Sequence, residues 1–225
     1  MNTAQVIRRL KSMRNLRNVA GMARFGINPH KTLGIPIPKL RALAKEIGRD
    51  HALAQKLWAS GIHEARILAS MVDDPKLVTS AQMEEWVRGF DSWDVCDQVC
   101  LNLFDQTLLA RRKALVWSKR SAEFEKRAGF ALMACLAWHD KEANDAAFLA
   151  FLPAITRGAA DERNFVKKAV NWALRQVGKR SRALNRAAIK TAREIQKLDA
   201  RSARWVARDA LKELESKAAQ RRLKK

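Results

Sequence analysis

The spacing of apolar residues is the feature that most constrains the fold of this chain. Apolar side chains recur at helical intervals nearly throughout, and the alternation that marks a half-buried strand is absent. Ala, Leu, Arg and Lys dominate, all of them good helix formers, and the 225 residues include only 9 Gly and 5 Pro. The sequence therefore predicts an all-α protein.

The helical segments are short, and short loops separate them. We expect helices at 3–25, 37–48, 51–60, 62–72, 80–90, 92–104, 106–118, 121–139, 143–152, 163–178, 181–197 and 200–219. Short loops make consecutive helices antiparallel neighbours. A run of hairpins that cannot bury their apolar faces alone favours a curved α-solenoid, with an irregular helical bundle as the alternative. We expect one domain over 1–219 and a frayed basic tail over 220–225.

The charge of the chain indicates its class of partner. Lys and Arg total 44 against 23 Asp and Glu, a formal net charge of +21. Such an excess favours a nucleic acid, with an anionic membrane surface as the weaker alternative. The charge is uneven, because residues 61–110 hold 3 basic and 9 acidic side chains while both flanking regions are strongly basic. A solenoid of this composition predicts a basic concave face about as wide as a DNA duplex.

Asp97 is the acidic residue that most needs an explanation. Asp91 and Asp94 stand at the start of a predicted helix, where they suit an N-cap and a capping-box-like pair. Asp97 lies a turn too deep to cap, on the same side of the helix as Trp93. A carboxylate at the edge of an apolar stripe is costly unless it is paired or used. We therefore expect either a buried salt bridge to an arginine of a neighbouring helix or a chemical role.

Two further residues stand out from their helical patterns. Trp172 lies off the centre of an apolar stripe, beside Lys168 and Arg175, so it is either a stacking surface near phosphate-binding cations or a core residue between helices. Arg127 precedes a strongly apolar run and shares its stripe with small residues that allow close approach. Its guanidinium suits a phosphate or a carboxylate such as that of Asp97.

Other chemistries find little support in the sequence. The four histidines are scattered, HExxH, CxxC, Walker and GxGxxG motifs are absent, and we expect neither a metal nor another cofactor. Cys96 and Cys100 are expected to be small core residues, and an odd total of three cysteines fits a reducing cytoplasm. We see no signal peptide and no run of about 18 apolar residues that would span a membrane.

The pattern breaks, taken together, resemble the AlkD-like DNA alkylation-repair glycosylases, which are HEAT-like repeat proteins. The resemblance covers roughly residues 15–215, and the Trp-Asp-x-x-Asp motif with its spacing to the later Arg and Trp is its most specific part. The matching segments are 22–25 (MARF), 33–41 (LGIPIPKLR), 92–97 (SWDVCD), 126–128 (KRA) and 165–175 (FVKKAVNWALR).

The resemblance implies a role for each matched residue. Asp97 matches the catalytic carboxylate of the family, and Trp93 and Trp172 match the aromatic residues that line the lesion. Arg127 matches an arginine that holds the DNA backbone. The remaining expected DNA contacts are Lys168, Arg175, Phe25 and Lys39. Two departures are Phe25, where members of the family can carry Tyr, and Ser92, which precedes a single Trp.

Our leading hypothesis is a cofactor-free, monofunctional DNA glycosylase for N3- and N7-alkylated purines in duplex DNA. It would act as a monomer in the cytoplasm, associated with the nucleoid in a prokaryote. One alternative is a non-catalytic HEAT-like module that binds branched or distorted DNA. The other is a basic helical scaffold for protein or RNA.

Overall fold

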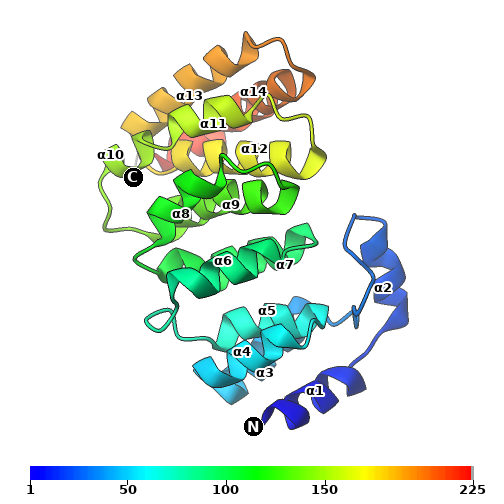
Figure 1. Ribbon diagram of the computed structural model, residues 1–225. Coiled ribbons are helices and arrows are strands. Elements are labelled where there is room, and N and C mark those ends of the chain that lie inside the picture. The colour runs from blue at the N-terminus through cyan, green and yellow to red at the C-terminus, as the bar shows by residue number, and fades with distance from the viewer. Residues whose placement is uncertain (224–225) are drawn as a thin grey trace. The chain divides into compact units, whose positions relative to one another are not determined.

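The computed structural model describes residues 1–223, and every regular element within them is a helix (Figure 1). The prediction of an all-α protein is confirmed. The chain divides into two compact units, residues 1–107 and 108–225. Each unit is built from helices joined by short connections. The single domain expected over 1–219 stays a prediction.

Unit 1 is organised around α5. This helix contacts α1, α3, α4 and α7, and it is almost entirely buried. The elements of unit 1 are α1 (Thr3–Ser12), α2 (Leu16–Ala23), α3 (Ile37–Ile47), α4 (His51–Ala59), α5 (His63–Val72), α6 (Ser80–Arg88), α7 (Trp93–Asn102) and the 3₁₀ helix η1 (Phe104–Gln106).

Unit 2 is organised around α12, which lies between α9 and α14. The 17-residue α9 carries the longest apolar run of the chain, and its residues 127–137 are all buried. The helices of unit 2 are α8 (Ala110–Trp117), α9 (Glu123–His139), α10 (Asp145–Leu149), α11 (Leu152–Gly158), α12 (Asn164–Gly178), α13 (Arg182–Gln196), α14 (Arg201–Leu214) and α15 (Lys217–Arg222).

The expected first helix, 3–25, is wrong, because the chain forms two helices there. Asn15 begins α2 as its N-cap, and its side chain accepts a hydrogen bond from the Asn18 amide. The Asn15 amide in turn donates to the Leu33 carbonyl at 2.7 Å. These two hydrogen bonds favour a helix that begins at Asn15 over one that continues through it. The spacing of apolar residues in the sequence does not reveal this preference.

Two other boundaries differ from the expected ones. The chain forms α11 at 152–158, where Pro153 stands in the first turn, a position that suits proline. The helix expected at 200–219 ends at Leu214, and Ser216 caps the separate α15. Residues 220–222 of the expected frayed tail belong to α15, whereas 224–225 lie outside the described residues.

The first turn of α5 holds a buried carboxylate that fixes the loop before α3. Glu64 is 1% exposed, and its two oxygens accept hydrogen bonds from the backbone amides of Leu33, Gly34 and Ile35 at 2.6–3.2 Å. A buried carboxylate is tolerated when several donors satisfy it. The loop over 33–35 is thereby tied to α5.

Gly34 generates a prediction about this loop. Its φ is +76°, and a Cβ would lie 2.2 Å from the backbone oxygen of Asn15, so Gly34→Ala introduces both strain and a clash. We expect Gly34→Ala to lower the free energy of unfolding by about 2–4 kcal/mol in denaturant titrations.

Gly21, inside α2, provides the matched control. A Cβ there meets nothing within 4 Å, and Gly21→Ala should raise the stability by about 0.5–1 kcal/mol. Equal stability of the two variants would contradict this account of the loop.

Candidate functional site

The start of α7 is held by a different set of acidic contacts from those expected. Asp91 is not the N-cap, because Ser92 occupies that position without a side-chain capping bond. Asp91 instead pairs with Arg66 at 2.9 Å and accepts a hydrogen bond from Asn28 at 2.9 Å. Arg66 also lies 4.4 Å from the centre of the Trp58 ring. Burial lowers the pKa of Arg66, and the charge of Asp91 partly offsets that effect.

Asp94 ties α7 to α5, which corrects its expected capping-box role. Its Oδ2 lies 2.8 Å from Nε2 of His63, a residue that is only 3% exposed. Its Oδ1 accepts hydrogen bonds from the Ser92 hydroxyl and the Val95 amide, both at 2.9 Å. Three hydrogen bonds to Asp94 therefore fix the first turn of α7, and they fix the direction in which the Trp93 side chain leaves that turn.

Trp93 and Asp97 stand one turn apart on α7, and both are half-buried. The indole Nε1 of Trp93 donates to the backbone oxygen of Phe25 at 3.0 Å, so the residues after α2 hold the ring in place. Phe25 itself is 72% exposed. The two half-buried side chains on α7 combine an aromatic surface and a carboxylate on the same side of one helix.

A pocket of about 640 Å³ lies against Trp93 within unit 1. Its volume is in the range of small-molecule sites. Apolar side chains dominate its wall, and the polar groups of α5 and α7 interrupt it. The principal lining residues are Met22, Phe25, Ile35, His63, Trp93 and Asp94.

The candidate residues of unit 2 lie mainly on α12. Lys168 is exposed and Trp172, one turn later, is half-buried. Arg175 is committed to α14, because its guanidinium contacts Glu213 at 2.8 Å and Asp209 at 3.5 Å. Of these two cations, Lys168 is the one that extends into solvent without a carboxylate partner among the described residues.

Arg127 is buried, at 6% exposure, and it joins α9 to α12. Its Nη1 donates to the backbone oxygen of Phe165 at 2.5 Å. The arginine therefore has a structural role in unit 2, whatever further partner it contacts. The remaining predicted residue, Lys39, is exposed in the first turn of α3 and does not line the pocket beside Trp93.

The structure thus gathers the predicted residues into two groups. Phe25, Lys39, Trp93 and Asp97 belong to unit 1, and the α12 residues with Arg127 belong to unit 2. Within residues 1–223, no cluster of three or more His, Cys, Asp or Glu side chains could hold a metal ion. No helix of this part of the chain is long and apolar enough to cross a membrane.

Sequence patterns do not reveal the buried polar contacts that position α7. His63 and Asp94 are 31 residues apart, and Glu64 is about as far from the amides that it accepts. Each residue taken alone suits an ordinary exposed helix terminus. Only the packing of α5 against α7 brings them together, and no local signal predicts that packing.

Comparison with known proteins identifies the family of this chain and a solved structure with a similar fold. The family described as DNA alkylation repair enzyme matches residues 6–214. A solved structure is similar over 96% of this chain and 94% of its own, with a TM-score of 0.77 and 21% sequence identity. That protein is described as part of a new family related to the HEAT-like repeat DNA glycosylases, with affinity for branched DNA structures. No curated protein matches the chain.

At 21% identity the structural likeness shows the fold alone, and it confirms the expected HEAT-like repeat architecture. The family match covers nearly the whole chain and confirms the resemblance that the Trp-Asp-x-x-Asp segment suggested. This protein belongs to the DNA alkylation repair enzyme family.

Proposed function

We propose that the protein is a DNA glycosylase that excises cationic N3- and N7-alkylated purines from duplex DNA. One observation carries the proposal: Trp93 and Asp97 lie one turn apart on α7, both partly open to solvent, in a chain of this family. The net charge of +21 supports a duplex DNA partner.

The proposed chemistry needs a fixed carboxylate more than any other group. A purine alkylated at N3 or N7 carries a positive charge and leaves readily as a neutral base, taking the electrons of its glycosidic bond. The deoxyribose then develops positive charge at C1′, which the Asp97 carboxylate would stabilise. Water forms the new bond to C1′, and Asp97 would position that water and accept its proton.

The aromatic residues would act on the same positive charge. An indole face attracts a nearby cation by about 0.5–2 kcal/mol. Trp93 would supply such a face beside Asp97, held by its hydrogen bond to Phe25. We propose that Trp172 supplies a second one and that Arg127, Lys168, Arg175, Phe25 and Lys39 contact the DNA. A cytoplasmic, nucleoid-associated monomer remains part of this proposal.

A non-catalytic, branched-DNA-binding protein is the second candidate. The similar solved structure is described by its affinity for branched DNA, and the two chains share their fold over nearly their whole length. A binding module has no need of a carboxylate beside a half-buried indole, so Asp97 favours the enzyme. The two candidates differ in whether a free base is released.

Asp97→Asn is the decisive variant for this choice. We expect the wild type to release 7-methylguanine or 3-methyladenine from methylated duplex DNA. Asp97→Asn should lose about 100- to 1,000-fold in single-turnover rate, because the charge that stabilises the sugar is gone, while affinity for DNA is retained. The exposed Asp199 provides the control, and Asp199→Asn should behave as the wild type. Tight DNA binding by a wild type that releases neither base would favour the binding module.

We expect Lys168 to contact a DNA phosphate and therefore to contribute equally to the affinity for every DNA sequence. Lys168→Ala should weaken binding to duplex DNA and reduce the slope of log affinity against log salt by about 0.9, the value for one lost phosphate contact. Arg186 is also exposed in unit 2, and Arg186→Ala removes the same charge from α13. Binding titrations over a range of salt concentrations that give one slope for both variants would remove Lys168 from the interface.

A further inference from the structure

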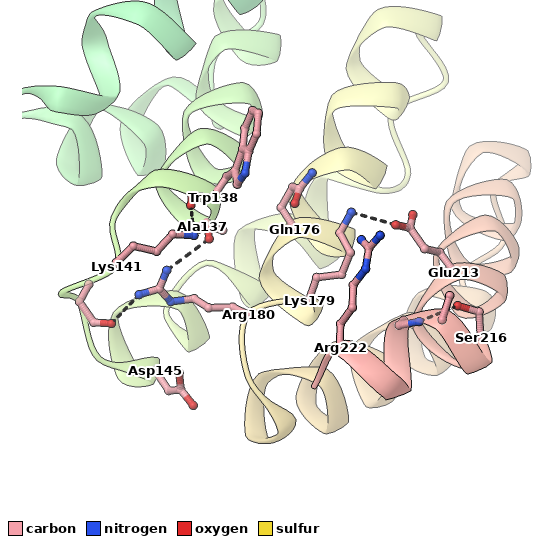
Figure 2. A pocket seen from close by; sticks show the side chains of 13 residues that line it. Ala137, Trp138, Lys141, Asp145, Gln176, Lys179, Arg180, Glu213, Ser216 and Arg222 are labelled. Atoms are coloured by element: carbon pink, nitrogen blue, oxygen red, sulfur yellow. Dashed lines mark hydrogen bonds and ion pairs between the residues drawn. The ribbon is translucent and has the colours of Figure 1, made fainter. Parts of the chain in front are cut away.

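A second hollow, of about 680 Å³, lies in unit 2 where α9, α12 and α14 end. Figure 2 shows side chains from these helices and from α15 around it. The hollow lies one helical turn further along α12 than the predicted Trp172, because Gln176 in its wall follows Trp172 by four residues. Its size is typical of pockets that bind small organic groups.

Trp138 gives this hollow an accessible aromatic surface. The indole stands at its edge in Figure 2 and is 51% exposed, unusual for a residue of such apolar area. Its ring stacks on that of His139, with centroids 4.8 Å apart, and the stack still leaves half of the residue open. Core packing therefore does not account for the position of Trp138.

Two of the four cations in the wall have structural roles. Arg180 donates to the backbone oxygens of Ala137 at 3.3 Å and Ala143 at 2.8 Å, and it lies 4.1 Å from the centre of the Phe148 ring. Lys141 donates to the Trp138 carbonyl. These contacts hold the end of α9 and the following loop. Both cations therefore have a structural role even without a ligand in the hollow.

The other two cations, Lys179 and Arg222, extend into the hollow (Figure 2). Lys179 contacts Glu213 at 2.8 Å, and Glu213 is shared with Arg175. Burial alone would raise the pKa of Glu213, but the hydrogen bond from Lys179 and the charge of Arg175 outweigh it, so the net effect is a lowered pKa. Arg222 has no carboxylate partner within residues 1–223, which leaves positive charge in the hollow.

The ends of the surrounding helices do not cancel this positive charge. Carbonyls at helix C-termini carry partial negative charge and would repel a phosphate. Here side-chain donors occupy several of them. Asn185 donates to the oxygens of Gly178 at 3.0 Å and Leu214 at 3.4 Å, and Gln220 also donates to Leu214, at 2.7 Å. The wall also holds two carboxylates, Glu213 and Asp145, of which Asp145 accepts a hydrogen bond from the Ser181 hydroxyl at 2.6 Å. Its four cations outnumber them, so an anion in the hollow would meet a net positive charge.

We propose that this hollow binds one unpaired nucleotide of DNA, with its base stacked on Trp138 and its phosphate held by Lys179 and Arg222. The amide of Gln176 offers both a donor and an acceptor to the edge of the base. Stacking on an aromatic side chain beside basic groups is the general means of binding unpaired nucleotides. The inference rests on the proposed action on DNA, and it adds recognition of a nucleotide that has left the duplex.

The test compares two duplexes of one sequence, one fully paired and one with a single unpaired 2-aminopurine nucleotide. We expect the wild type to bind the bulged duplex more tightly and to quench its 2-aminopurine fluorescence. Trp138→Ala should reduce affinity for the bulged duplex by about tenfold, the typical effect of losing one stacked base, with little change for the paired duplex. Trp138→Phe should restore most of the preference, and Arg222→Ala should reduce it.

Arg186→Ala, which removes a cation from α13 elsewhere in unit 2, should keep the preference, and thermal unfolding checks that each variant is folded. The proposal is overturned if the wild type shows no preference for the bulge, or if Trp138→Ala keeps it. Competition by free dAMP without any bulge preference would also overturn it, since the ligand would then be a free nucleotide. Base release and binding of paired duplex report separately on the proposed glycosylase function.

Discussion

The buried polar contacts in the first turn of α5 are the constraint on which the candidate site of unit 1 depends. Glu64 accepts three backbone amides from the loop before α3, and His63 lies 2.8 Å from Asp94 at the start of α7. One helical turn thus joins the loop on one side to the helix of Trp93 and Asp97 on the other. Removing one member of such a contact leaves its partner buried and unsatisfied, which costs about 1–3 kcal/mol.

In unit 2, α12 is the helix that joins its neighbours through buried polar contacts. Arg127 ties α9 to it through the Phe165 carbonyl, and Asn171 donates to the Val206 carbonyl of α14 at 3.2 Å. Arg175 adds a further contact between α12 and α14, because its guanidinium forms a salt bridge with Glu213. Some cations of this helix therefore form structural pairs, whereas others are exposed to solvent. The total charge alone does not identify which of them contact DNA.

Helical periodicity was sufficient to predict the all-α architecture and the shared face of Trp93 and Asp97, because both follow from local spacing. The family resemblance, drawn from short motifs, is confirmed over residues 6–214. Local spacing could not predict that Asp91 pairs with Arg66 instead of capping α7, or that Asp94 binds His63. Those contacts depend on which helices pack together, and an aspartate before a helix has the same pattern in either case.

The chemistry assigned to Asp97 is tested most directly by affinity for a sugar that already carries the proposed positive charge. A duplex in which a protonated pyrrolidine replaces one deoxyribose mimics that charge, and a neutral tetrahydrofuran of the same shape is its control. We predict that the wild type prefers the charged duplex by about a hundredfold, as for a transition-state mimic, and that Asp97→Asn loses this preference. Equal affinity of the wild type for both duplexes would contradict the role of Asp97.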